Sequence, residues 1–279
     1  MIQTELRGGT FVHEGHRLHF EDYGTGDQVL VYTNGLLLDT QLNRGVAQAL
    51  ADRGHRVLLL DLLGHGESDK LADVSAYRMD TYARQVVGLL DHLGLDRAAI
   101  GGISLGANVS LQVAVQFPER TKALVVEMPV LEWATPAAAL TFIPILLAMR
   151  YAGPVADAFT GLVRRLPSTP IGPLNSFLHA ASTRPDVMAS ILHGVLVGPV
   201  APTADDRRAI AAPTLVLGHG NDFIHPYSDA EGLAAQIPAA RLERATSPFE
   251  LRLHPDRLTG VISDFLHDVW REPADRVQA

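Results

Sequence analysis

The sequence predicts an α/β fold: a mostly parallel, doubly wound β-sheet with helices on both faces, interrupted by a helical insertion. In the first half of the chain, short runs rich in β-branched residues alternate with longer segments of helical periodicity. This alternation stops for about 80 residues, in which no strand pattern is convincing. We therefore expect a sheet domain made of residues 1–128 and 211–279 and a helical cap made of residues 129–210.

Each element follows from its local pattern. Strands are expected at residues 17–23, 28–33, 56–60, 98–101 and 123–126, and again at 213–218 and 241–245. Helices are expected near residues 41–53, 82–93, 105–117 and 256–270. Because a parallel sheet brings the carboxyl ends of its strands to one edge, the cap is expected to cover that edge.

Composition excludes several classes of function. The chain has 279 residues, 47% of them hydrophobic, and a formal net charge of -8. An acidic surface is repelled by phosphate backbones, so we expect no nucleic-acid partner. The absence of cysteine excludes disulfides, thiolate metal sites and a cysteine nucleophile. No metal-ligand cluster, phosphate-binding loop or dinucleotide fingerprint is present, so no cofactor and no metal are expected.

The sequence also bears on membranes and compartment. The first twenty residues alternate polar and apolar side chains and lack the apolar core of a signal peptide. The most apolar stretch, residues 129–149, is interrupted by Glu132, Pro136 and Pro144. A spanning helix needs about 20 apolar residues in succession. We therefore expect no membrane span and a cytoplasmic protein, and the sequence leaves a homodimer open.

The pattern G-x-S-x-G occurs at residues 102–106, between a predicted strand and a predicted helix. Its glycines permit the strained turn that would expose Ser104 above the sheet edge. Free backbone amides and the positive end of the helix dipole would stabilise an oxyanion there. Ser104 is therefore the candidate nucleophile; the alternative is that the glycines only allow the strand and helix to pack closely.

Three further motifs accompany this one in a fixed order: V-Y-T-N-G at residues 31–35, D-L-L-G-H-G-E-S at 61–68 and L-G-H-G-N-D at 217–222. With them the chain resembles the α/β-hydrolase superfamily, in particular its serine-nucleophile members with a helical cap. The resemblance implies that the amides of Leu36 and Leu105 form an oxyanion hole and that Asp222 is the acid of a triad. Asp222 could instead only shape an Asx-turn. Glu127, at the end of a predicted strand, is the alternative acid, unless it is a salt-bridged hinge residue.

The resemblance fails at the general base. It implies a histidine about seven residues before the proline that starts the last helix, and position 248 is itself a proline. His225 and His254 remain near the appropriate sheet edge. We favour His225, because it shares a loop with Asp222, which could fix its tautomer. Each has a simpler interpretation, as a loop contact for His225 and as a surface or helix-terminus contact for His254.

Three functions fit these observations. The first is a cofactor-free serine hydrolase, most simply a carboxylic ester hydrolase, acting on a small or medium apolar ester, lactone or thioester. The second is a lyase, isomerase or cyclase that uses Asp222 or His225 as base and forms no acyl-enzyme. The third is a binding protein without catalysis. Apolar runs at residues 140–147 and 191–196 favour an apolar substrate, unless they only pack on the sheet domain.

Overall fold

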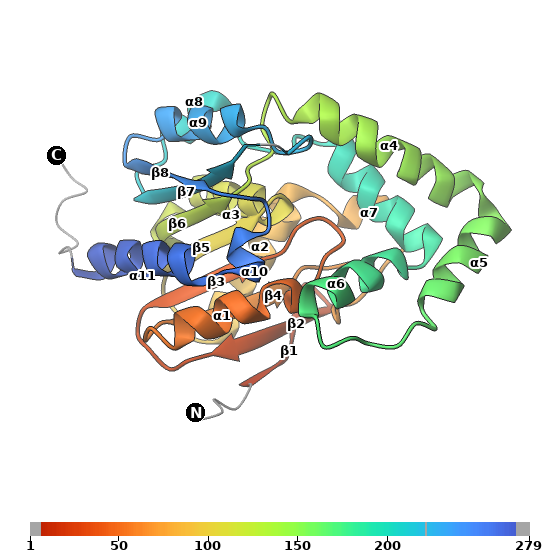
Figure 1. Cartoon of the computed structure of the whole chain (residues 1–279), viewed down its shortest axis with the longest axis horizontal. Coiled ribbons are helices and arrows are strands. Elements are labelled where there is room, and N and C mark those ends of the chain that lie inside the picture. Colours follow the sequence, from red (N-terminus) through yellow and green to blue (C-terminus); the bar gives the residue numbers. More distant parts are fainter. Residues whose placement is uncertain (1–6, 221, 272–279) are drawn as a thin grey trace.

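The computed structural model describes residues 7–220 and 222–271, which form one eight-stranded sheet with helices around it (Figure 1). The strands lie in the order β1-β2-β4-β3-β5-β6-β7-β8. Their bounds are β1 Arg7–His13, β2 His16–Tyr23, β3 Val29–Thr33, β4 Arg56–Asp61, β5 Ala98–Ile103, β6 Thr121–Glu127, β7 Thr214–His219 and β8 Ala240–Ala245.

The sheet is antiparallel at one edge and parallel elsewhere. β1 pairs antiparallel with β2, and β2 pairs antiparallel with β4. All pairs from β4 through β8 are parallel. The carboxyl ends of β3, β5, β6 and β7 therefore meet at one edge, where ligands bind in open α/β sheets.

Helices cover both faces of the sheet. α1 (Arg44–Ala51) and α11 (Asp256–Arg271) pack on one face, and α2 (Met79–His92), α3 (Leu105–Gln116) and α9 (Tyr227–Gln236) pack on the other. In β4, for example, Val57 and Leu59 pack in the core on the first face, and Leu58 and Leu60 pack in the core on the second. All four side chains are buried. Burial on both faces explains why the parallel strands are almost wholly apolar.

Four of the five described helices between β6 and β7 project from the sheet, on the right in Figure 1. We call them the helical insertion: α4 Thr135–Tyr151, α5 Gly153–Val163, α6 Gly172–Ala181 and α7 Pro185–Val197. α8 (Ala204–Arg208) and the single-turn helices Thr40–Leu42, Val74–Ala76, Pro118–Arg120 and Glu250–Leu253 (α10) complete the described elements. No single described helix is long and apolar enough to cross a membrane, whereas α4 and α5 taken together, bent by 107°, meet that test of length and composition.

Two side chains fasten the helical insertion to the sheet domain. The Asn108 amide on α3 donates to the carbonyl oxygens of Val130 at 2.7 Å and Val200 at 2.8 Å, one before α4 and one after α7. The Asp229 carboxylate on α9 accepts from the backbone amides of Leu131, Trp133 and Ala134. Because Asn108 lies one helical turn after Ser104, the insertion is held beside the start of α3.

Apart from single-turn helices, two described elements were not predicted from the sequence. β1 was missed because a polar, glycine-containing run at the edge of a sheet has little strand signal. α9 was missed because its ten residues bury only Asp229, Ala230 and Leu233 and so lack a continuous apolar stripe. Neither element changes the prediction that the site lies at the carboxyl ends of the parallel strands.

Candidate active site

Ser104 occupies a sharp turn between β5 and α3, with φ of 56° and ψ of -111°. A side chain in this region is strained, and such strain is stored where a side chain must be exposed. The Ser104 amide donates to the carbonyl oxygen of Glu127 on β6 at 2.9 Å, which fixes the turn to the sheet edge.

Both glycines of the G-x-S-x-G motif are required by close packing. A Cβ at Gly102 would lie 2.5 Å from the Gly106 carbonyl carbon and 2.7 Å from the Thr33 carbonyl oxygen. A Cβ at Gly106 would overlap the Thr33 carbonyl oxygen. The glycines therefore let α3 pack closely against β3 and β5, and Ser104 lies in the turn between them.

His225 lies between Ser104 and Asp222. Its Nε2 is 2.9 Å from Ser104 Oγ, and its Nδ1 is 2.9 Å from Asp222 Oδ2. The His225 and Asp222 side chains are only 15% and 18% exposed. These distances suit a histidine that donates from Nδ1 to the carboxylate and accepts the hydroxyl proton at Nε2.

The Asp222 carboxylate has two separate contacts. Its Oδ1 accepts from the backbone amides of Ile224 at 2.7 Å and His225 at 3.1 Å, which is an Asx-turn, while Oδ2 faces the imidazole. Burial alone would raise the pKa of Asp222, but the hydrogen bonds from His225 and from these amides hold it below its usual range. The carboxylate is thus ionised beside His225.

The other sequence candidates lie elsewhere. His254 ends α10, is exposed, and its backbone amide donates to the Glu250 carbonyl oxygen. Glu127 is buried, and its carboxylate accepts from the Tyr32 hydroxyl at 2.5 Å and pairs with Arg252. Burial, followed by the charge of Glu127, raises the pKa of Tyr32. Glu127 therefore contacts Arg252 and Tyr32, as the salt-bridged interpretation of this residue required.

Arg252 was not found by sequence reasoning. Its side chain is 2% exposed and reaches from α10 to Glu127 and to Asn43, whose Oδ1 accepts from Nη2 at 2.6 Å. Asn43 in turn donates to Asn34 at the end of β3. Arg252 thus joins the segment that supports Ser104 to the segment that leads to Leu36. No local pattern marks a buried arginine on a four-residue helix.

The segment after β3 lies beside Ser104. The Leu38 amide donates to the Gly35 carbonyl oxygen at 3.0 Å, closing a turn in which Leu37 has φ of 66°. A Cβ at Gly35 would lie 3.7 Å from Ser104 Cβ, so the turn passes directly beside the serine. Leu105 begins α3, where backbone amides have no acceptor within the helix.

A small apolar cavity of about 50 Å³ adjoins Ser104. Apart from Ser104 and Asn108 it is lined by hydrophobic side chains: Leu36, Met79, Leu105, Val130, Ala138, Phe142, Val195, Leu196, Val200 and Ile224. An apolar cavity of about 150 Å³ holds a benzene ring. The space beside Ser104 therefore matches a short alkyl group. In the described part of the chain, no three His, Asp or Glu side chains are grouped as a metal site would need.

Known proteins resemble this chain over its length and in its fold. It is 28% identical over 254 residues to the 2-hydroxymuconate semialdehyde hydrolase of Pseudomonas putida, covering 86% of each protein. It is 37% identical over 113 residues to a 2-hydroxy-6-oxononadienedioate/2-hydroxy-6-oxononatrienedioate hydrolase of Burkholderia vietnamiensis, but this covers only 39% of the chain and 38% of the relative.

Solved structures of other proteins have the same fold as this chain. A thermophilic esterase from Thermogutta terrifontis superimposes with a TM-score of 0.75 at 25% identity, covering 95% of this chain and 99% of the esterase. An enol-lactonase from Burkholderia xenovorans gives 0.74 at 22% identity, covering 93% and 100%, and shows the same fold. The family model described as alpha/beta hydrolase fold matches residues 28–247, well over half of the chain. The protein therefore belongs to the α/β-hydrolase fold family.

Proposed function

We propose that the protein is a serine hydrolase that cleaves a carboxylic ester or lactone through an acyl-enzyme. The observation that carries this proposal is the pair of 2.9 Å contacts that connect Asp222, His225 and Ser104. A serine hydroxyl is a weak nucleophile and needs an adjacent base. His225 supplies one from a loop of this chain.

Acylation follows from the geometry. His225 Nε2 accepts the proton of Ser104 Oγ as the oxygen attacks the ester carbonyl carbon, and the carbonyl π electrons move onto oxygen. The ionised Asp222 stabilises the resulting imidazolium and keeps Nδ1 protonated. When the tetrahedral intermediate collapses, the bond to the alcohol oxygen breaks and His225 returns the proton to that oxygen.

Deacylation repeats these steps with water. His225 Nε2 takes a proton from a water molecule as its oxygen attacks the acyl carbon, and Ser104 Oγ leaves with the proton from His225. In both steps the Leu36 and Leu105 amides stabilise the negative oxygen. One such donor contributes on the order of 3 kcal/mol to the transition state.

The apolar cavity beside Ser104 supports a substrate with a small alkyl group on one side of the ester. Its volume of about 50 Å³ leaves little room for an aromatic ring. The named relatives are all hydrolases, which supports the reaction class and leaves the substrate of this chain a proposal.

A fluorophosphonate probe tests the proposal. It phosphonylates a serine that an adjacent base activates, so peptide mass spectrometry should find the label on Ser104 in the wild-type protein and on no peptide of Ser104→Ala. Folded wild-type protein that takes up no label at Ser104 would contradict the proposal. Full turnover of a substrate by Ser104→Ala would instead favour the non-hydrolytic alternative, and ligand binding without any turnover would favour the binding protein.

A further inference from the structure

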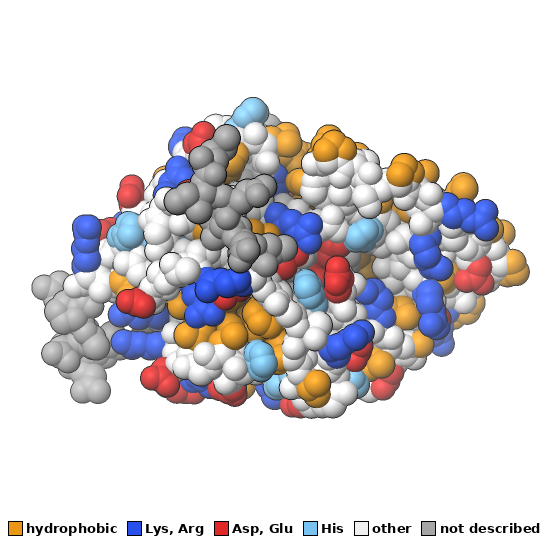
Figure 2. All heavy atoms as spheres, turned by 90° about the horizontal axis from the view of Figure 1, so that it is seen from below, with side chains coloured by type: hydrophobic (Ala, Val, Ile, Leu, Met, Phe, Trp, Pro, Cys, Tyr) orange, Lys and Arg blue, Asp and Glu red, His pale blue; other side chains and the backbone are white. Residues whose placement is uncertain are grey.

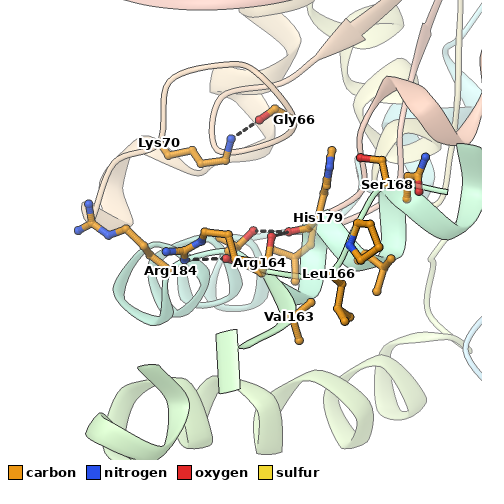
Figure 3. Close-up of a pocket in the computed structure, with 14 residues that line it drawn as sticks. Gly66, Lys70, Val163, Arg164, Leu166, Ser168, His179 and Arg184 are labelled. Carbon is orange, nitrogen blue, oxygen red and sulfur yellow. Dashed lines mark hydrogen bonds between the residues drawn. The ribbon is translucent and has the colours of Figure 1, made fainter. Parts of the chain in front are cut away.

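A second cavity is lined by Leu37, in the turn that also carries Leu36. Its volume is about 470 Å³, and it opens between the loop at Gly66–Lys70 and the helical insertion (Figure 3). Leu36 lines the apolar cavity with Ser104, and the next residue, Leu37, lines this larger one. One turn of backbone therefore separates the two spaces.

Positive side chains from three segments line this cavity, which we call the cationic pocket. Lys70 comes from the loop after β4, Arg164 from the end of α5 and Arg184 from the start of α7 (Figure 3). The chain as a whole carries -8. Residues 133–183, by contrast, contain three arginines and one aspartate and so carry a net charge of +2. The remaining residues of the chain therefore carry a net charge of -10. Figure 2 shows Lys and Arg side chains beside hydrophobic ones at the end of the molecule formed by α4 and α5.

Lys70 and Arg164 have no carboxylate partner among the described residues. Lys70 Nζ donates to the Gly66 carbonyl oxygen, and Arg164 Nη2 donates to the Ser182 carbonyl oxygen at 2.9 Å. Burial lowers the pKa of Lys70, although Asp61 and Asp39 attract its positive charge. Lys70 is exposed at the mouth of the pocket, and its ammonium can form a charge-assisted hydrogen bond with an anionic ligand.

No Asp or Glu is among the described residues that line the pocket, and two carboxylates next to its lining have partners of their own. Asp39 accepts from His179 Nδ1 at 2.8 Å, and Asp186 pairs with Arg184. Arg184 therefore already has a carboxylate partner, whereas Lys70 and Arg164 donate only to backbone carbonyl oxygens among the described residues. Ser168 and Asn175 add neutral polar side chains to the same wall.

We propose that the cationic pocket binds a free carboxylate of the substrate, so that the protein prefers half-esters of dicarboxylic acids. This proposal rests on the proposed function. The small alkyl group of such an ester would occupy the apolar cavity beside Ser104, the ester carbonyl would lie at Leu36 and Leu105, and the acid end would pass the Leu37 turn to reach Lys70 and Arg164.

The experiment compares monoethyl and diethyl esters of succinic, adipic and suberic acid. For at least one chain length, wild-type kcat/KM should be about ten times higher for the monoethyl ester, and this ratio should fall as NaCl is raised, because salt screens partly exposed charges. Arg164→Gln and Lys70→Gln should each lower the ratio by a factor of about ten. Arg165→Gln, which removes the adjacent arginine that does not line the pocket, should leave the ratio unchanged.

Equal rates on the two ester series, or the same change in ratio for Arg164→Gln and Arg165→Gln, would overturn the proposal. If wild-type protein hydrolyses none of these esters, labelling of Ser104 by the fluorophosphonate probe decides the proposed function, and the pocket is tested separately by calorimetry with succinate and adipate. Binding that weakens about tenfold in Arg164→Gln, but not in Arg165→Gln, would support the pocket independently. No measurable binding of either diacid would overturn it.

Discussion

Arg252 and Glu127 form an ion pair that is almost closed to solvent, with side chains 2% and 5% exposed. Removing one partner leaves the other charge buried without compensation, which typically costs 3–5 kcal/mol. We predict that Arg252→Met lowers the free energy of unfolding in urea by about that amount. The double variant Glu127→Gln/Arg252→Met should recover a large part of the loss. Equal losses in the single and double variants would show that the pairing itself is unimportant.

Asn108 is predicted to hold the helical insertion in place. Asn108→Ala removes the donors to Val130 and Val200 and leaves their carbonyl oxygens unsatisfied, at about 1–3 kcal/mol for each buried group. Limited proteolysis should then cut within residues 130–200 faster than in the wild type. Asn175→Ala, whose side-chain hydrogen bonds stay within its own loop, is the control. Equal cutting rates for both variants would rule out this role of Asn108.

The size of the apolar cavity is predicted to limit the length of the substrate's alkyl group. Phe142 lines it from α4, so Phe142→Ala should enlarge it and raise kcat/KM for hexyl acetate relative to ethyl acetate by about tenfold or more. Leu140→Ala, on the exposed side of the same helix, should leave this preference as in the wild type. An unchanged preference in Phe142→Ala would mean that the alkyl group binds elsewhere.

Acid is predicted to destabilise the fold through His65. Burial lowers the pKa of His65 to about 4, whereas an unfolded histidine has a pKa of about 6.5. The unfolded chain therefore binds the proton first as the pH falls, and stability is lost below pH ~6.5 and down to pH ~4. Between pH 7.5 and pH 5 this amounts to roughly 2 kcal/mol.

Urea unfolding at the two pH values measures this loss. His65→Gln should lose less stability between pH 7.5 and pH 5 than the wild type, by roughly those 2 kcal/mol. His254→Gln removes an exposed histidine and should keep the wild-type pH dependence. A His65→Gln variant as acid-sensitive as the wild type would assign the effect to other groups.

The sequence predicted the features that are local. The parallel strands are apolar because both of their faces are buried, and the turn at Ser104 requires glycines within two residues of it. The mostly parallel sheet, its strand ends and the family were therefore predictable. The proximity of Asp222 and His225 was also accessible, because both lie on one loop.

Contacts between distant segments were not predictable. Arg252 lies 125 residues from Glu127, and Asn108 binds Val130 and Val200, which are 22 and 92 residues away. Such contacts depend on how elements pack, and a single sequence carries no record of that. The cationic pocket is a similar case, because Lys70, Arg164 and Arg184 come from three separate segments.

The most direct test of the account is the rate of ethyl acetate hydrolysis, followed by pH-stat, in the matched variants His225→Ala and His254→Ala. Removal of a triad histidine leaves only the contributions of binding and the oxyanion hole. We therefore predict that His225→Ala loses at least about a hundredfold in kcat, the lower range for a general base. His254→Ala should match the wild type. A His225→Ala variant with wild-type turnover, or an equal loss in His254→Ala, would contradict the assignment of His225 as the base.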